Sequence, residues 1–456
     1  MKLPLWRIAE FVQAVGQYPP DATATGYSID SRTIVRGQLF FAVKGDRFDG
    51  HDFVQAALDR GAIAAVVAED RLAHFPEKSR LLVVGDTLAA LQRLAQMVRC
   101  MWGKPVVGIT GSAGKTTTKE CVARVLESKY RVLKSEGNLN NHFGLPLQLL
   151  KLEPEHDLAV LEMGMSRAGE IAALAKLAQP NTGVVTMVAP VHLEFFDSIK
   201  DIARAKYELI ESLPHGGCAV LNADDDYVSQ FGRNFHGTVL MFGVKRPADM
   251  SAADVELLGA EGSTFTACFR EERVPAAMPL IGEHNVYNAL AAYAVGVHHG
   301  VPLQQAVEVL KTLQPSEKRG QMLEIGGATV VNDCYNSNPK ALNSMVNALS
   351  RIPAKRRIVV AGEMLELGPE GARLHRESGQ HVAGKADFLL GVRGLAKAMV
   401  QGAQAAGVQA EFVESAEDAG DWLARNVKYG DAVLLKASRG VKLERALERW
   451  REAIRS

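Results

Sequence analysis

Residues 107–117 read Val-Gly-Ile-Thr-Gly-Ser-Ala-Gly-Lys-Thr-Thr, and no other stretch says more about the architecture of the chain. An apolar strand runs into a glycine turn. Lys115 and Thr116 then open a helix whose apolar side includes Cys121 and Val125. Such a loop turns backbone N–H groups and a lysine towards phosphate and offers a hydroxyl to Mg²⁺. The stretch therefore predicts a phosphate-binding loop, because an ordinary glycine-rich turn would not require the whole succession of strand, turn, Lys-Thr-Thr and helix.

The glycines of this loop do not follow the common GxxxxGK[ST] spacing. Ile109 occupies the position of the first glycine, and the glycines fall at Gly108, Gly111 and Gly114. The spacing therefore differs from that of the common GTPases and kinases, and it resembles the shorter loop of the Mur-type ATP-dependent amide ligases.

The composition limits the class of protein. A length of 456 residues suggests about three domains. Lysine plus arginine and aspartate plus glutamate number 52 each, so no net charge attracts nucleic acid or an anionic membrane. Five scattered cysteines lack metal-binding spacing and predict reduced thiols in a cytoplasmic protein. The amphipathic start predicts no signal peptide, and no apolar run is long enough to insert in a membrane. No motif requires an oligomer, so we expect a monomer.

Turn signals and periodicity predict an α/β protein of three domains. We expect a small α/β domain at 1–102, a central P-loop domain with a mostly parallel sheet at 103–314, and a C-terminal Rossmann-like domain at 315–456. Gly103-Lys104-Pro105 and Gln314-Pro315-Ser316 mark the boundaries. The last domain lacks a GxGxxG sequence after its first strand, so a dinucleotide cofactor is not indicated.

Apolar runs predict where the strands lie. Continuous runs at 158–163 and 183–188 are typical of parallel strands buried on both faces, whereas 265–270 alternates and predicts an antiparallel patch. The other predicted strands are 38–43, 62–68, 80–84, 218–222, 239–243, 328–332, 357–361, 387–392, 410–413 and 431–436.

Two candidate groups follow strands at the sheet edge where α/β proteins bind ligands. Glu162 ends the strand 158–163, and a carboxylate near the Thr116 hydroxyl is a suitable oxygen ligand for Mg²⁺. A strand-end glutamate turned to water is the alternative, and the phosphate-binding loop upstream favours the metal. His192 follows the next strand, but a loop histidine is more often solvated or a cap, so its position alone assigns it no role.

Three further groups lie near predicted helix starts or the second boundary. Asn285 and Asn288 lie one turn apart and can read the edge of adenine, although Asn285 is an equally good N-cap. Asp333 precedes a helix that Pro339 can open, and it either accepts ribose hydroxyls or serves as a turn residue. Arg319 can reach a γ-phosphate if the domains close, or it remains solvated.

Lys206 falls within the apolar stripe of a helix predicted over 201–213. Desolvation disfavours the charged form there, and a neutral lysine amine is a nucleophile that can capture CO₂. The alternative is that Lys206 extends along the helix to water. Asp224-Asp225-Asp226 is expected to be a solvated turn with no chemical role.

Together these motifs resemble the Mur ligase family over almost the whole chain. The resemblance is carried by Thr110-Gly-Ser-Ala-Gly-Lys-Thr116, Glu162, His192, Lys206, His284, Asn285, Asn288, Arg319 and Lys436-Ala-Ser-Arg439. Within the family, the members that add D-alanyl-D-alanine are most similar at Ser28-Ile-Asp-Ser-Arg32 and at residues 39–51, 138–146, 335–339 and 362–368. The Asp-Asn-Pro-Arg signature of the members that add the third amino acid is absent from this chain.

The resemblance implies an ATP-dependent ligase of peptidoglycan precursor synthesis. ATP, with Mg²⁺, would phosphorylate the terminal carboxylate of UDP-N-acetylmuramoyl-tripeptide, and the amine of D-alanyl-D-alanine would attack the acyl phosphate. The implied catalytic residues are Lys115, Lys206, His192 and Arg319. The implied metal ligands are Thr116, Glu162, His192 and Lys206 as a carbamate, the modification that related Mur ligases carry.

The resemblance also assigns the remaining contacts. The implied ATP-binding residues are Gly111, Ser112, Ala113, Gly114, Lys115, Thr116, Thr117, Asn285, Asn288, Arg319 and Asp333. The implied UDP-binding residues are Ser31, Arg32, Lys44, Asp49 and His51. Lys436, Ser438 and Arg439 would face the incoming dipeptide or the closed cleft.

Three alternatives remain open. A family member that adds the third amino acid shares the first domain. A folylpolyglutamate-type ligase shares the other two domains, but it lacks a UDP-binding first domain. If the chain were a P-loop kinase or a nucleotide-gated binding module, Lys206 and the motif at residues 335–339, which begins with Tyr335, would be unexplained.

Overall fold

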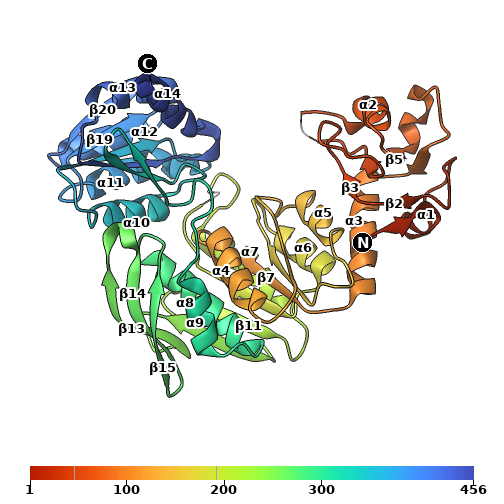
Figure 1. Ribbon diagram of the computed structural model, residues 1–456, viewed down its shortest axis with the longest axis horizontal. Coiled ribbons are helices and arrows are strands. Elements are labelled where there is room, and N and C mark those ends of the chain that lie inside the picture. The colour runs from red at the N-terminus through yellow and green to blue at the C-terminus, as the bar shows by residue number, and fades with distance from the viewer. Residues whose placement is uncertain (46, 192, 456) are drawn as a thin grey trace.

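The computed structural model describes residues 1–45, 47–191 and 193–455. The α/β class and the three-unit architecture predicted from the sequence are confirmed: separate sheets have four, nine and six strands, and a further strand pair lies near the N-terminus. In Figure 1 the N-terminal and C-terminal units lie at opposite ends of the molecule, with the central unit between them. The boundaries predicted at 102/103 and 314/315 stay predictions.

The N-terminal unit contains a four-stranded parallel sheet in the order β3-β4-β5-β6. Its elements are β1 (Leu3–Pro4), α1 (Leu5–Val12), β2 (Thr23–Ala24), β3 (Tyr27–Ser28), β4 (Leu39–Phe41), α2 (Val54–Asp59), β5 (Ala64–Ala68), β6 (Leu81–Val84) and α3 (Thr87–Trp102). Helix α3 fastens this unit to the centre, because Arg99 Nε donates to the Ala178 carbonyl at 2.6 Å and Trp102 Nε1 to the His156 carbonyl at 3.1 Å.

The central unit is built on a nine-stranded sheet in the order β15-β14-β13-β12-β11-β10-β7-β9-β8. Its elements are β7 (Val106–Thr110), α4 (Lys115–Glu127), β8 (Val132–Lys134), α5 (Gly144–Leu149), β9 (Leu158–Glu162), α6 (Glu170–Ala178), β10 (Thr182–Val185), α7 (Ile199–Glu211), β11 (Cys218–Asn222), β12 (Thr238–Gly243), β13 (Met250–Leu257), β14 (Ser263–Phe269), β15 (Glu272–Met278), α8 (His284–His298) and α9 (Leu303–Leu310).

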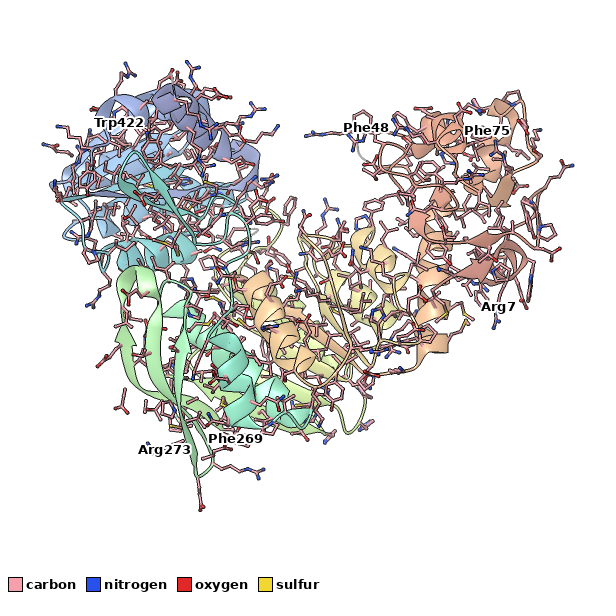
Figure 2. The ribbon with its side chains drawn as sticks, in the orientation of Figure 1. Arg7, Phe48, Phe75, Phe269, Arg273 and Trp422 are labelled. Carbon is pink, nitrogen blue, oxygen red and sulfur yellow. The ribbon has the colours of Figure 1, made fainter. Side chains whose placement is uncertain are left out.

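The predicted antiparallel patch is confirmed, since β14 pairs antiparallel with both β13 and β15. Figure 2 labels Phe269 and Arg273 near the end of the β14–β15 hairpin, which projects away from the rest of the molecule.

Alternating side chains divide the central core between the two faces of the sheet. Val106 of β7 belongs to the hydrophobic cluster that contains side chains of α3, α6 and α7, whereas Val107 belongs to the cluster that contains side chains of α4, α8 and α9. This arrangement brings the carboxyl ends of β7, β9 and β10 to one edge, as expected for parallel strands with crossover helices.

The C-terminal unit carries a six-stranded sheet in the order β16-β17-β21-β18-β19-β20. Its elements are β16 (Gln321–Ile325), β17 (Ala328–Asn332), α10 (Pro339–Leu349), β18 (Arg356–Gly362), α11 (Gly371–His381), β19 (Phe388–Val392), α12 (Ala396–Ala405), β20 (Gln409–Val413), α13 (Ala416–Asn426), β21 (Asp431–Lys436) and α14 (Glu444–Arg455). All pairs except β16–β17 are parallel. Among the described residues, no helix has both the length and the apolar character needed to cross a bilayer.

Candidate active site

The loop between β7 and α4 has the backbone of a phosphate-binding turn. Gly111 and Gly114 have φ values of +151° and +82°, which favour glycine. A Cβ on Gly111 would lie 1.8 Å from the Thr186 hydroxyl, and a Cβ on Gly114 would lie 2.9 Å from Asn288 Oδ1. These positions therefore require glycine for both conformation and space, and the loop can approach a ligand with its backbone.

Lys115 begins α4 and bends back over this loop. Its ammonium donates to the Gly111 carbonyl at 2.7 Å. Burial lowers the pKa of Lys115, the nearby Glu162 carboxylate acts in the opposite direction, and Arg319 adds to the lowering. The lysine is thus positioned where a phosphate oxygen could replace a backbone carbonyl as its partner.

Glu162 ends β9 beside the first turn of α4. It is 3 % exposed, and its carboxylate accepts from Thr116 Oγ1 at 2.9 Å and from Asn140 Nδ2 at 2.7 Å. The alternative of a glutamate turned to water is therefore wrong. No role was predicted for Asn140, although it lies in the stretch 138–146 that carries part of the family resemblance.

Arg319 approaches the same turn from the chain segment that enters the C-terminal unit. Its Nη2 donates to Thr116 Oγ1 at 3.3 Å, and its guanidinium carbon lies 3.9 Å from the centre of the Tyr335 ring. The solvated alternative for Arg319 is wrong, because its Nε is buried and has no hydrogen-bond partner. Arg439 lies on the same ring at 5.8 Å, so Tyr335 contacts two cations.

The two predicted adenine-reading amides are bonded to each other at the start of α8. Asn288 Nδ2 donates to Asn285 Oδ1 at 2.8 Å, and Thr118 Oγ1 donates to Asn288 Oδ1 at 3.0 Å. The N-cap interpretation of Asn285 is wrong, because Glu283 is the N-cap of α8 and Asn285 lies within the first turn. The pair ties α8 to α4 beside the phosphate loop.

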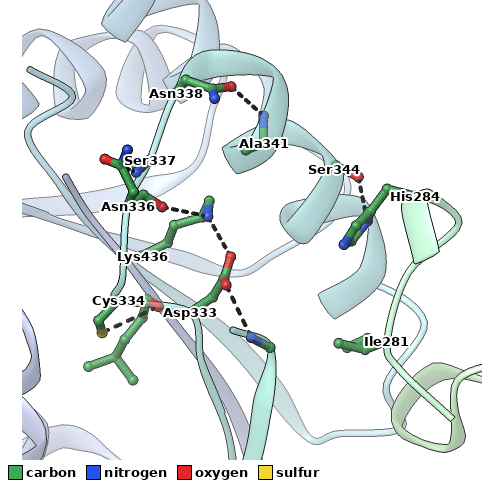
Figure 3. Close-up of polar contacts among 12 residues, drawn as sticks. Ile281, His284, Asp333, Cys334, Asn336, Ser337, Asn338, Ala341, Ser344 and Lys436 are labelled. Atoms are coloured by element: carbon green, nitrogen blue, oxygen red, sulfur yellow. Dashed lines mark hydrogen bonds and ion pairs between the residues drawn. The ribbon is translucent and has the colours of Figure 1, made fainter. Parts of the chain in front are cut away.

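Asp333 follows β17 and pairs with Lys436 at the end of the neighbouring β21 (Figure 3). Lys436 Nζ also donates to the Asn336 carbonyl at 2.9 Å, and Asp333 Oδ1 accepts from the Gly320 N–H at 3.1 Å. The predicted helix start is confirmed, since Asn338 caps α10 through the Ala341 N–H at 2.9 Å and Pro339 occupies its first turn.

His284 lies opposite α10 in the same region, and its Nδ1 lies 3.0 Å from Ser344 Oγ (Figure 3). Burial lowers its pKa to about 4, so the ring is neutral at physiological pH. This contact joins the central unit to the C-terminal unit through an uncharged pair.

A cavity of about 960 Å³ connects most of these groups. Of the predicted site residues, its lining includes Ser112, Ala113, Gly114, Lys115, Thr116, Thr117, Glu162, Asn285, Asn288, Arg319, Asp333, Lys436 and Arg439. The structure thus gathers residues from the central and C-terminal units into one site. The lining does not include Gly111, Lys206, Ser438 or the UDP-binding candidates of the N-terminal unit, Ser31, Arg32, Lys44, Asp49 and His51. His192 lies outside the described residues.

The N-terminal candidates form a separate group. Arg32 is 84 % exposed and pairs with Asp30 at 2.7 Å. Ser31 adjoins this pair, and Lys44 is exposed. His51 Nδ1 lies 2.6 Å from Asp49 Oδ1, and His51 Nε2 accepts from the Ala68 N–H at 2.9 Å. The acceptor role of Nε2 requires a neutral ring with its proton on Nδ1, so Asp49 and His51 hold the loop to β5.

Lys206 is 2 % exposed on the inner face of α7. The alternative of a side chain that reaches water is therefore wrong. Burial lowers its pKa well below the usual value, and the charge of Lys115 adds to the effect. None of the described carboxylates lies within ion-pair distance of Lys206, so the site favours a neutral amine.

The expectation of a solvated turn at 224–226 is wrong for two of its three residues. Asp225 is 6 % exposed and accepts from the Val188 N–H at 2.9 Å, which ties the segment after β10 to β11. Asp224 accepts from three consecutive N–H groups, Val244, Lys245 and Arg246, and from the Tyr287 hydroxyl. Asp224 and Asp225 therefore shape one wall of the cavity.

Comparison with known proteins matches three family models along the chain: the Mur ligase family catalytic domain at 23–102, the Mur ligase middle domain at 109–296, and the Mur ligase glutamate ligase domain at 318–439. Among curated relatives, UDP-N-acetylmuramoyl-tripeptide--D-alanyl-D-alanine ligase of Bacillus subtilis (strain 168) is 34 % identical, and the match covers 97 % of each chain.

Several solved structures resemble the chain over nearly its full length, including the following two. A crystal structure of MurF from Acinetobacter baumannii has a TM-score of 0.89 and 28 % identity, with 99 % of both chains covered. MurF ligase from Thermotoga maritima in complex with ADP has a TM-score of 0.82 and 30 % identity, covering 95 % of this chain and 98 % of that one. Because the chain matches the family models and is 34 % identical to a curated family member over 97 % of its length, it belongs to the Mur ligase family.

Proposed function

We propose that this chain is an ADP-forming ligase that joins D-alanyl-D-alanine to UDP-N-acetylmuramoyl-tripeptide in peptidoglycan precursor synthesis. The observation that carries the proposal is the match over 97 % of the chain to a relative named for this activity. The match includes the N-terminal unit, which a folylpolyglutamate-type ligase would lack. The missing Asp-Asn-Pro-Arg signature argues against the member that adds the third amino acid.

The proposed reaction has two steps. A carboxylate oxygen of the tripeptide attacks the γ-phosphorus of ATP, and ADP leaves with the electrons of the broken P–O bond. The D-alanyl-D-alanine amine then attacks the acyl carbon, loses a proton, and expels phosphate as the amide forms. Negative charge spreads over the transferring phosphoryl group, so cations directed at it stabilise the transition state. Lys115 and Arg319 are the cations that the cavity offers beside the phosphate loop.

The donors around Thr116 fit Mg²⁺. The Thr116 hydroxyl and the Glu162 carboxylate are hard oxygen ligands 2.9 Å apart, and Mg²⁺ fills its remaining positions with water and phosphate oxygens. When bound, Mg²⁺ would neutralise charge on the phosphates. We assign Thr116 and Glu162 to one metal ion, and His192 to a second on the family resemblance alone.

The remaining substrate contacts follow the same resemblance. ATP would bind residues 111–117, with adenosine near Asn285, Asn288 and Asp333. The UDP group would bind the N-terminal unit at Ser31, Arg32, Lys44, Asp49 and His51. Lys436, Ser438 and Arg439 would face the incoming dipeptide or the closed cleft. We further propose that the enzyme acts as a monomer in the cytoplasm.

Lys206 is proposed to act as a carbamate. Its burial favours a neutral amine, which attacks CO₂ at carbon and releases a proton. The product is an oxygen ligand suited to the second Mg²⁺. Lys206→Ala should be nearly inactive and partly rescued by acetate, and carbon-13 NMR under bicarbonate should detect the adduct. A Lys206→Ala enzyme with normal turnover would end the idea.

One experiment tests the proposed function. Phosphate release is followed with ATP and UDP-N-acetylmuramoyl-tripeptide while D-alanyl-D-alanine, single amino acids or glutamate is offered as the amine. Release that depends on D-alanyl-D-alanine is expected. Release with glutamate would favour the folylpolyglutamate-type alternative, and a kinase or nucleotide-gated module would show no amine dependence. The dipeptide substrate with single amino acids tests the remaining alternative.

A further inference from the structure

A buried lysine lies one helical turn beyond the phosphate loop and points away from it. Lys119 is 1 % exposed, and its Nζ donates to the Ser135 carbonyl at 2.6 Å and pairs with Glu120 at 2.8 Å. Burying an ammonium costs several kcal/mol unless its donors are satisfied. Lys119 does not line the nucleotide cavity, so direct contact with substrate does not account for this cation.

The residue that Lys119 holds is itself bonded to the end of β9. Ser135 follows β8 and is 2 % exposed, and its Oγ accepts from the Glu162 N–H at 3.0 Å. The Ser135 N–H donates to the Val160 carbonyl, also at 3.0 Å. Ser135 therefore fixes the backbone on both sides of Leu161, immediately before the Glu162 carboxylate leaves the sheet.

The Glu162 carboxylate has little freedom because both of its oxygens are engaged. Thr116 Oγ1 contacts one and Asn140 Nδ2 the other. Thr116 and Lys119 belong to the same helix, one on the cavity side and one behind it. The helix thus reaches Glu162 by two routes, directly through Thr116 and indirectly through Lys119 and Ser135.

We infer that Lys119, acting through Ser135, is a positioning residue that sets the Glu162 carboxylate in register with the Thr116 hydroxyl for a nucleotide-bound divalent cation. This inference rests on the proposed metal role of Thr116 and Glu162. Groups that orient metal ligands typically change metal affinity by about 10–100-fold when removed. A merely structural role for Lys119 would lower stability without this selective effect.

The test compares Lys119→Met, Ser135→Ala and the double variant with Lys134→Met as the matched control. Lys134 pairs with the same Glu120 at 2.7 Å but is 40 % exposed, and within the described part of the chain its ammonium makes no hydrogen bond to the neighbouring Ser135. The readout is the dissociation constant of Mn²⁺ for the enzyme–ADP complex, measured by electron paramagnetic resonance. Thermal unfolding of each variant accompanies it.

We expect Lys119→Met and Ser135→Ala each to weaken Mn²⁺ binding by about tenfold. The double variant should bind Mn²⁺ no more weakly than the single variant with the larger defect, because both substitutions break the same chain of contacts. Lys134→Met should stay within about twofold of the wild type. The KM for Mg²⁺ in turnover should rise in the same order, with little change in the KM for the UDP substrate.

Normal Mn²⁺ affinity in folded Lys119→Met would overturn the inference, as would equal weakening in Lys134→Met. If Lys119→Met does not fold, Ser135→Ala provides the test instead. Normal Mn²⁺ affinity in Ser135→Ala would also overturn the inference. Because Mn²⁺ and ADP are measured without the UDP-linked peptide or D-alanyl-D-alanine, a wrong assignment of either substrate would leave this result unchanged.

Discussion

Replacing Tyr335 by leucine should slow the chemical step without weakening binding of the UDP substrate. The Tyr335 ring supports the Arg319 guanidinium at 3.9 Å, and the buried Arg319 Nε has no hydrogen-bond partner. The hydrogen bond from Arg319 Nη2 to Thr116 Oγ1 is long, at 3.3 Å. Loss of the ring therefore leaves the cation free to turn away from the phosphate loop.

The expected magnitude follows from the geometry. A cation stacked on an aromatic ring gains up to about 2 kcal/mol when the contact is desolvated. If Arg319 contacts the phosphoryl group chiefly in the transition state, that loss appears in kcat and amounts to roughly 30-fold. Tyr335→Phe keeps the ring and is the matched control, for which we expect turnover within about threefold of the wild type.

The assay is phosphate release at saturating ATP and D-alanyl-D-alanine with varied UDP-N-acetylmuramoyl-tripeptide, and thermal unfolding checks that each variant is folded. Undiminished kcat in Tyr335→Leu would refute the supporting role of the ring. Equal defects in the leucine and phenylalanine variants would show instead that the hydroxyl, and not the stacked ring, matters.

Three other outcomes are expected. Asp333→Asn leaves the Lys436 ammonium, which is 4 % exposed, without its carboxylate, so hydrogen exchange in β21 should report a loss of stability of about 3 kcal/mol. The double variant Asp333→Asn/Lys436→Met should recover most of this stability. An equal loss in the double variant would contradict the prediction. Arg32→Ala should raise the KM for the UDP substrate by roughly tenfold with little change in kcat, and a pure kcat defect would remove it from that site. Burial lowers the pKa of Lys206, so unfolding takes up a proton below pH 10.5. In CO₂-free buffer Lys206→Met should therefore melt above the wild type at pH 7, and the difference should shrink as pH rises towards 10.5; a constant difference would contradict a titrating amine.

The sequence predicts the elements around the site better than the contacts within it. The strands predicted at 158–163 and 328–332 lie at β9 and β17, because long apolar runs bounded by turns permit few other structures. The short β8 and the strands β13, β15 and β16 were not predicted. Three residues of β8 carry too little periodicity, and β13, β15 and β16 are partly exposed and lack a continuous apolar run.

Long-range partners explain most of what the sequence could not predict at the site. Asn140, Ser135 and Tyr335 are ordinary polar or aromatic residues in loops, and only the fold brings them to Glu162 and Arg319. Spacing alone left Asn285 with two interpretations, since an N-cap and a first-turn residue differ by only one or two positions.

The same contacts explain how nucleotide binding can couple the central and C-terminal units. Lys115 donates to the Gly111 carbonyl, while Arg319 and Glu162 both contact the Thr116 hydroxyl. A phosphate oxygen is a charged acceptor and binds these cations more strongly than a neutral carbonyl or hydroxyl does. Nucleotide binding is therefore favoured when Lys115 and Arg319 exchange the Gly111 carbonyl and the Thr116 hydroxyl for phosphate oxygens. Arg319 lies at the start of the C-terminal unit, and its guanidinium is stacked on the Tyr335 ring of that unit. Any movement of the arginine towards a phosphate must therefore shift the C-terminal unit or separate the guanidinium from the ring. A variant that weakens the stack should accordingly loosen the link between nucleotide binding and domain position before it abolishes binding itself.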